Sequence, residues 1–235
     1  MGAARPGRSA EGGLAPAMAA RAYDRIGRLQ DTQAPIERAA VERMVVAGRL
    51  RDARAIFELG CGTGALARRL LSDVLPDTAT YVGADVSPRM VALARRRLEP
   101  WPQRSRVVHL DGTLPLPVPD GCADRFVAAY VLDLLEPAYA RSVLRDAHRV
   151  LGDGGLLCVS SLTWGRSLAG RAVSATWAKL WRVAPSLVGG CRPVSVKDLL
   201  GPEWQVEEDV VVESWGVASE IVIATRDPQA VRRSL

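Results

Sequence analysis

Short apolar runs alternate with helical patterns between residues 55 and 162, and this alternation constrains the fold more than any other feature of the sequence. The runs have the length of strands, whereas the segments between them repeat apolar residues every three or four positions. Such an alternation is typical of a parallel sheet covered by helices on both faces. We expect strands at 55–59, 80–84, 107–110, 126–131 and 155–162, and helices at 64–74, 88–98 and 138–151.

The C-terminal part departs from this rhythm. Residues 205–213 and 216–225 are both rich in strand-forming side chains, and the two residues between them leave no room for a crossover helix. The two runs should therefore form an antiparallel hairpin. The sequence predicts a Rossmann-like, doubly wound α/β fold whose sheet is mostly parallel and ends in this hairpin.

Three segments lie outside the alternation. Residues 1–17 are rich in Gly, Ala and Pro, so we expect a flexible tail. Residues 18–50 carry a helical pattern that Pro35 interrupts, which predicts a helical cap. Residues 163–200 precede the hairpin and are the candidate lid or acceptor segment. Because the length is ordinary for one domain, we expect a single domain over 18–235.

Charge and cysteine content exclude several classes of protein. Lys and Arg exceed Asp and Glu by five, but both signs are interleaved along most of the chain, which does not favour a nucleic-acid partner. The four cysteines form no Cys-x-x-Cys pair, so we expect no metal site and a reducing, cytoplasmic location. No apolar run reaches the roughly 18 residues that span a bilayer, so we expect no integral membrane association. The protein should be a monomer or homodimer.

A glycine-rich turn, ELGCGTG at residues 58–64, follows the first predicted strand. Glycines in such a turn let the backbone approach a ligand closely. The same turn also satisfies the dinucleotide pattern Gly-x-Gly-x-x-Ala, so by itself it leaves an NAD-type cofactor open.

Three carboxylates surround this turn in the predicted fold. Asp85 ends the second strand, where it can accept hydrogen bonds from both hydroxyls of an adenosine ribose. Glu58 precedes the first glycine, where its charge would repel a pyrophosphate and favour a cationic ligand. Asp111 follows the third strand and is placed to accept a hydrogen bond from an adenine amine. Three acids suit an adenosine that bears an ammonium and a sulfonium group.

Five stretches of the sequence occur in the order and spacing of a known family. They are ELGCGTG at 58–64, VGADVSP at 82–88, DGTLPLPVPDGCADRF at 111–126, AYVLDLL at 129–135 and RVLGDGGLL at 149–157.

On these stretches the chain resembles the class I S-adenosylmethionine-dependent methyltransferases, and within them the small-molecule group that includes the ubiquinone and menaquinone biosynthesis enzymes. The resemblance covers about residues 55–160 and the terminal hairpin. It implies a seven-stranded sheet, S-adenosylmethionine as the cofactor, and methyl transfer to a small, lipophilic or aromatic acceptor in biosynthesis.

Carried over by position, the resemblance also implies a cofactor site. The turn would line the methionine end of the cofactor, Asp85 would hold the ribose, and Asp111 with Gly112 would flank the adenine. Tyr130 would contact the methionine portion, and Tyr23 in the helical cap would close over the cofactor. The full predicted set is Glu58, Gly60, Cys61, Gly62, Gly64, Asp85, Val86, Met90, Asp111, Gly112, Tyr130 and Tyr23.

Methyl transfer is an in-line displacement in which the protein mainly positions the acceptor. If the acceptor must lose a proton, Asp133 is the candidate base, with Tyr130 beside it. Relatives of this group often carry histidine at that position. Asp133 is alternatively a helix N-cap. Trp177 and Trp181 either pack the lid on the core or line the acceptor pocket.

Two other functions stay open at this point. The dinucleotide pattern leaves an NAD-dependent oxidoreductase, although the chain has no Tyr-xxx-Lys pair. A cofactor-binding accessory subunit without catalysis is the second alternative. A nucleic-acid acceptor is disfavoured, because residues 129–132 read Ala-Tyr-Val-Leu where methyltransferases of base amines usually carry Asn/Asp-Pro-Pro-aromatic.

Overall fold

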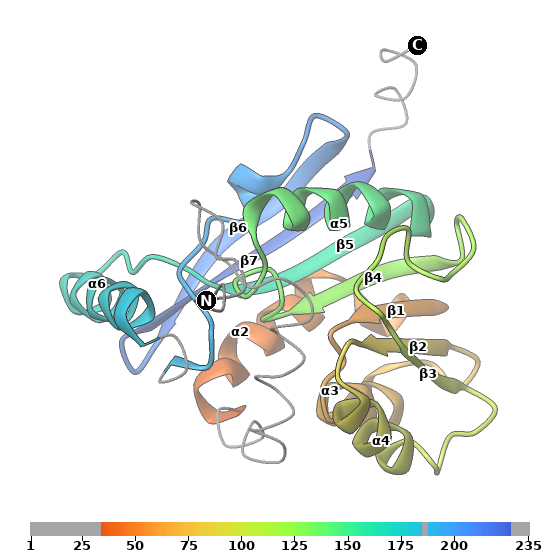
Figure 1. Ribbon diagram of the computed structural model, residues 1–235. Helices are drawn as coiled ribbons and strands as arrows, with labels where there is room; N and C mark the ends of the chain where they lie inside the picture. The colour runs from red at the N-terminus through yellow and green to blue at the C-terminus, as the bar shows by residue number, and fades with distance from the viewer. Residues whose placement is uncertain (1–33, 185–187, 227–235) are drawn as a thin grey trace, which may run out of the picture.

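The computed structural model describes residues 34–184 and 188–226, and they form the predicted doubly wound α/β architecture (Figure 1). One seven-stranded sheet has the order β3-β2-β1-β4-β5-β7-β6. The first five strands are parallel, and β7 runs antiparallel to both of its neighbours. The strands are β1 (Ala55–Leu59), β2 (Thr80–Asp85), β3 (Ser105–His109), β4 (Ala123–Ala129), β5 (Leu151–Leu162), β6 (Trp204–Ser214) and β7 (Val217–Arg226).

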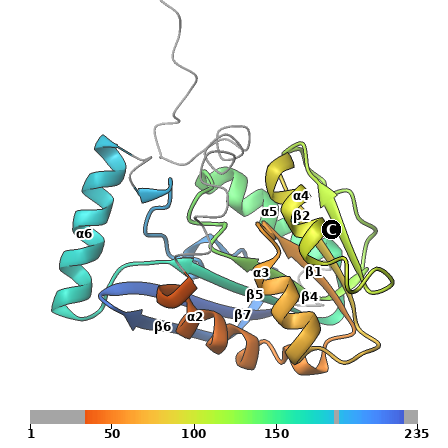
Figure 2. The ribbon, with the colours of Figure 1, turned by 90° about the horizontal axis from the view of Figure 1, so that it is seen from below.

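Helices cover both faces of the sheet. Figures 1 and 2 show α5 on one face and α2, α3 and α4 on the other, whereas α6 lies at the end of the sheet, apart from both groups. Short helical turns η2, η3 and η5 complete the connections. The helices are α2 (Ala34–Ala47), η2 (Leu50–Asp52), α3 (Ala65–Arg69), η3 (Leu70–Val74), α4 (Pro88–Arg97), α5 (Pro137–Val150), α6 (Leu168–Val183) and η5 (Lys197–Leu199).

Alternating side chains along the strands supply two hydrophobic cores. Phe57 and Leu59 of β1 join the core beneath α5, whereas Ile56 joins the core beneath α2, α3 and α4. The same alternation holds in β4, where Phe126 and Val127 face opposite cores. Strands buried on both faces explain why these runs are continuously apolar in sequence.

The predicted elements are confirmed, with shifts of up to four residues at strand ends: β4 begins at Ala123 and β5 at Leu151, both earlier than predicted. β4 ends at Ala129 because Tyr130 has a φ of 54°, a left-handed backbone conformation that strands do not adopt. β3 is an edge strand and begins at Ser105, because an exposed edge can carry polar residues that give no apolar signal.

The predicted helical cap is described only from Ala34, where α2 begins with Pro35 in its first turn. The predicted tail and Tyr23 lie outside the described residues. No helix in residues 34–184 and 188–226 is long and apolar enough to cross a membrane.

Candidate active site

A cavity opens at the carboxyl ends of β1, β2 and β4. Strand order reverses between β1 and β4, and sheets of this class bind ligands at that switch point. The cavity holds about 710 Å³ of empty space, part of it open to solvent. Its lining is mainly apolar and consists of Leu59, Gly60, Asp85, Val86, Leu110, Leu116, Ala129, Tyr130, Val131, Leu134, Leu135, Tyr139 and Val143.

The glycine turn between β1 and α3 has the predicted position, but chain packing accounts for two of its glycines. Gly60 lines the cavity with a φ of 69°, and a Cβ there would collide with Val131 Cγ2. Gly64 has a φ of 76°, and its Cβ would lie 3.1 Å from the Cα of Ala94 on α4. Side chains at these positions are therefore excluded by the fold itself as well as by any ligand.

Asp85 reaches the cavity from the end of β2 and is held by the backbone. Its Oδ2 accepts from the N–H of Gly62 at 2.9 Å, and its Oδ1 accepts from the N–H of Ser87 at 2.8 Å. Each oxygen keeps acceptor capacity for a further donor. Burial raises the pKa of the carboxyl, and the two backbone hydrogen bonds oppose this shift. The geometry suits a ligand with two neighbouring hydroxyl groups.

Glu58 lies beneath the turn and is absent from the cavity lining. Its side chain is 2% exposed, and Tyr81 Oη donates to its Oε2 at 2.6 Å. Burial raises its pKa to about 7. The sequence predicted a full negative charge beside the ligand. This expectation is corrected: near neutral pH the carboxyl is only partly ionised, because desolvation penalises the charged form.

This raised pKa predicts a pH-dependent stability. A carboxyl whose folded-state pKa exceeds its unfolded value stabilises the fold below about pH 4.5 and loses that contribution as pH rises through about 7. We expect Glu58→Gln to match the wild type near pH 5 and to exceed it in unfolding free energy by up to about 3 kcal/mol near pH 8. Denaturant titrations at both pH values measure this, and a difference that does not change with pH contradicts it.

Two other residues of the predicted site, Cys61 and Met90, are also buried outside the lining. Cys61 is 5% exposed, and burial raises the pKa of its thiol, so it is a packed side chain of the turn. Met90 is fully buried, and its N–H donates to Ser87 Oγ at the start of α4. Both residues therefore belong to the buried core next to the site and do not face the cavity.

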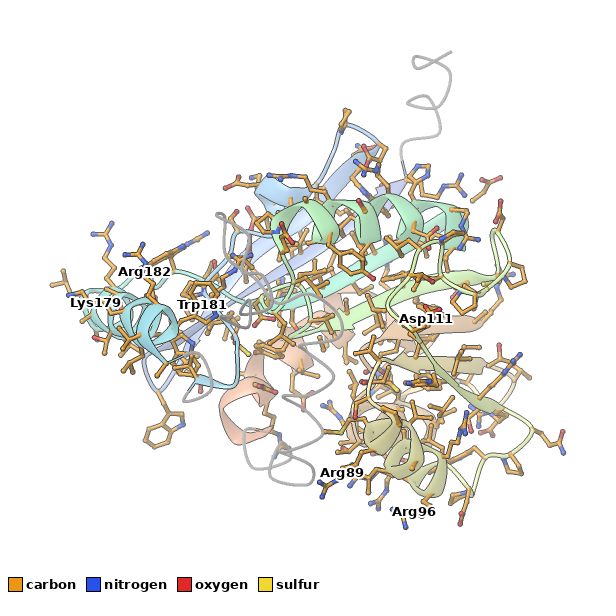
Figure 3. All side chains as sticks on the ribbon, in the orientation of Figure 1. Arg89, Arg96, Asp111, Lys179, Trp181 and Arg182 are labelled. Carbon is orange, nitrogen blue, oxygen red and sulfur yellow. The ribbon has the colours of Figure 1, made fainter. Side chains whose placement is uncertain are left out.

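The loop after β3 carries the predicted adenine contacts. Asp111 is exposed, and Thr113 donates to its Oδ1 through both the N–H and Oγ1, which lowers the pKa of the carboxyl. Figure 3 shows Asp111 on this loop. Sequence reasoning missed Tyr139 of α5, which lines the cavity and donates from Oη to the Gly112 carbonyl at 2.9 Å. In the sequence Tyr139 looks like any aromatic residue of a helix, and only the packing of α5 against this loop brings it to the cavity.

Tyr130 lies on the cavity wall where the sequence placed it. Its left-handed backbone is held by an N–H that donates to the Ser160 carbonyl at 2.8 Å. Its Oη lies 2.7 Å from Ser219 Oγ on β7. A non-glycine residue in this conformation is strained, and such strain is frequent at functional sites.

The structure gives no support to a catalytic role for Asp133. This residue is fully buried and does not line the cavity, and its Oδ2 accepts from the Leu162 N–H at 3.2 Å. Nor does it cap a helix, because the N-cap residue of α5 is Glu136. Burial raises its pKa to about 7. Its hydrogen bond joins the loop after β4 to the end of β5, which is a structural role.

The predicted lid segment contains α6, and two tryptophans of this helix form hydrogen bonds to the loop at 190–191. Trp177 Nε1 donates to the Cys191 carbonyl at 3.0 Å, and Trp181 Nε1 donates to the Gly190 carbonyl at 2.9 Å. Neither tryptophan lines the main cavity. Of the two alternatives left by the sequence, the structure favours packing.

Comparison with known proteins connects part of the chain to a family. Residues 56–155 match a family model described as a methyltransferase domain. The match spans less than half of the chain, and this segment is similar to the class I S-adenosylmethionine-dependent methyltransferases. Between the two cofactor classes that the glycine turn left open, the match supports S-adenosylmethionine.

Individual relatives match this chain only in part. A demethylmenaquinone methyltransferase from Thermus thermophilus is 38% identical over 106 residues, which are 45% of this chain and 46% of that protein. The tRNA N(3)-methylcytidine methyltransferase Mettl2 from Drosophila melanogaster is 34% identical over 107 residues, 44% of this chain and 33% of that protein. This chain thus spans less than half the length of these curated relatives.

A solved structure extends the likeness in fold beyond the matched region. The N-methyltransferase NodS from Bradyrhizobium japonicum, in complex with S-adenosylhomocysteine, has a TM-score of 0.63 at 19% identity. The alignment covers 88% of this chain and 98% of NodS. At this identity the likeness concerns the fold alone.

Proposed function

We propose that this chain transfers a methyl group from S-adenosylmethionine to a small, lipophilic or aromatic acceptor. The observation that carries the proposal is the mainly apolar cavity at the β1–β4 switch point, which brings together Gly60, Asp85 and Val86. An apolar cavity with a few fixed polar groups is the usual form of a small-molecule site.

The residues of the cavity fit the cofactor. Asp85 offers two oriented oxygens to the ribose hydroxyls, and Val86 offers an apolar contact to the adenine. Gly112, held by Tyr139, and the charged Asp111 would flank the adenine. S-adenosylmethionine, when bound, supplies a methyl group on a positively charged sulfur. The turn residues Glu58, Cys61, Gly62 and Gly64, and Met90 of α4, do not line the cavity and would support the site through packing.

The described lining of the cavity offers the acceptor no obvious general base. Among the described residues that line the cavity, the ionisable side chains are Asp85, Tyr130 and Tyr139. Burial raises the pKa of both tyrosine hydroxyls, so they stay protonated at neutral pH. With Asp85 engaged by the ribose, we propose an acceptor that is nucleophilic without losing a proton or that ionises on its own, as an acidic phenol or enol does.

The cellular setting is part of the proposal. The four cysteines Cys61, Cys122, Cys158 and Cys191 form no disulfide bond, which supports a reducing, cytoplasmic location. We propose a monomer or homodimer that needs no metal. A tRNA acceptor, as in one relative, and an accessory subunit without catalysis are the competing functions.

Two measurements test the proposal. In thermal unfolding, we expect S-adenosylhomocysteine to stabilise the chain and NADH to leave it unchanged. Incubation with methyl-labelled S-adenosylmethionine should then label compounds in a lipophilic small-molecule extract but not purified tRNA. Labelled tRNA alone would overturn the acceptor class. Cofactor binding without any labelled product would favour the accessory subunit.

A further inference from the structure

Large exposed apolar side chains gather at one end of the molecule, which we call the α6 edge: residues 164–183 and the β6–β7 turn at 214–217. Among the described residues, six large apolar side chains are exposed, and five of them lie on this edge. Three are almost fully exposed: Trp215 at 89%, Leu168 at 86% and Val183 at 85%. The five side chains are Trp164, Leu168, Leu180, Val183 and Trp215.

The hairpin turn and α6 form one surface. Glu213 on β6 accepts hydrogen bonds from the N–H groups of Arg166 and Ser167, just before α6 begins. A Cβ on Gly216 in the turn would lie 3.1 Å from Val173 Cγ2 on α6. The exposed Trp215 therefore stands beside the exposed side chains of the helix.

The segment that contains α6 carries a positive charge excess as large as that of the whole chain. Residues 163–200 contain six Lys and Arg and one acid, Asp198, so their excess of five equals that of the whole chain. Arg171, Lys179 and Arg182 are exposed on α6. Figure 3 shows Lys179 and Arg182 on the helix, at the end of the molecule opposite to α4.

The inner and outer faces of α6 differ in their contacts. Trp177 and Trp181 anchor the inner face to the loop at 190–191, as described above. On the outer face, apolar residues are exposed, and Lys179 lies among them. These outer apolar residues are Leu168, Ala172, Ala175 and Val183.

We propose that the α6 edge binds the surface of an anionic lipid bilayer. A helix with exposed apolar residues, basic residues alongside and no acid has the composition of an interfacial membrane helix. The exposed Trp164 and Trp215 of this edge suit the headgroup region. Long basic side chains can reach the phosphates while their stems lie along apolar surface.

Other occupants fit these observations less well. A second copy of the chain would bring two segments of like excess charge together, which opposes pairing through this face. An RNA would neutralise the basic side chains but leave Leu168 and Val183 against a polar backbone. Of these three occupants, a bilayer surface alone satisfies both the charges and the apolar stripe.

The α6 edge is connected to the cavity. The loop that the two tryptophans anchor continues to Arg192, whose N–H donates to the Asp133 carbonyl at 3.1 Å and whose Nη2 donates to the Leu135 carbonyl at 2.8 Å. Leu135 lines the cavity. Bilayer contact at the α6 edge would thus place a lipophilic acceptor near the site. This consequence rests on the proposed function, whereas binding to the bilayer does not.

Flotation of the full chain with vesicles tests the proposal. We expect binding to vesicles of phosphatidylcholine and phosphatidylglycerol in equal parts, weak binding to phosphatidylcholine alone, and release by salt. The double variant Arg171→Glu/Lys179→Glu should bind at least about tenfold less. Leu168→Ser/Val183→Ser should also bind less, because its apolar contact is lost.

Matched variants control for charge and folding. Arg89→Glu/Arg96→Glu makes the same charge change on α4, which Figure 3 shows at the opposite end of the molecule, and should retain most of the binding. A cooperative thermal unfolding transition near that of the wild type verifies that each variant is folded. Equal binding to both vesicle types, or equal loss in the α4 and α6 variants, overturns the proposal. So does a dimer in vesicle-free solution that Leu168→Ser/Val183→Ser dissociates. Absence of methyl transfer leaves the vesicle result unaffected, so the two proposals fail separately.

Discussion

The Asp85→Ala variant is expected to bind S-adenosylhomocysteine about 10- to 100-fold more weakly than the wild type. The carboxylate presents two oxygens to the cavity, each fixed by a backbone N–H, and its removal deletes charge-assisted hydrogen bonds to the ligand. Such bonds are worth roughly 1.5 to 3 kcal/mol each. Calorimetric titration of the purified variants measures the change.

Asp124→Ala is the matched control for this loss. Asp124 accepts backbone hydrogen bonds from Arg54 at 2.9 Å and Ala55 at 3.3 Å, but it does so at the amino end of β1, away from the cavity. We expect Asp124→Ala to lower thermal stability without changing the affinity for S-adenosylhomocysteine. Wild-type affinity in Asp85→Ala, or the same loss in both variants, would remove Asp85 from the ribose site.

The Gly60→Ala variant should lose about 2 to 4 kcal/mol of unfolding free energy together with cofactor binding. The left-handed φ of 69° disfavours any residue with a Cβ by roughly 1 kcal/mol. The new Cβ would also collide with Val131 Cγ2, and overpacking of this kind typically costs about 1 to 3 kcal/mol. Denaturant unfolding measures the first loss and calorimetry the second.

Two further variants separate the causes. Gly154 has a similar φ of 71° and nothing within 4 Å of its Cβ position, so Gly154→Ala reports the backbone cost alone. Adding Val131→Ala to Gly60→Ala should recover part of the stability, because it removes the collision but not the strain. If Gly60→Ala costs no more than Gly154→Ala, Val131 does not restrict this turn.

Sequence patterns predicted most of the fold because its strands are buried on both faces. Residues such as Phe57 and Phe126 produce continuous apolar runs, and the helices between them keep a clear period. The predicted positions of Gly60, Asp85 and Tyr130 at one edge follow from the rule that parallel strands present their carboxyl ends together. All three line the cavity.

The sequence by itself determined the α/β class, the order of its elements, the antiparallel hairpin and the resemblance to a methyltransferase domain, because period, turn residues and motif spacing are local properties of the chain. Only the tertiary structure decided which polar residues face the cavity. Glu58 and Asp133 lie within the motifs yet are buried against other elements, whereas Tyr139 reaches the cavity from a helix that no motif marks. Burial and access depend on how distant segments pack, and a linear pattern does not encode this directly.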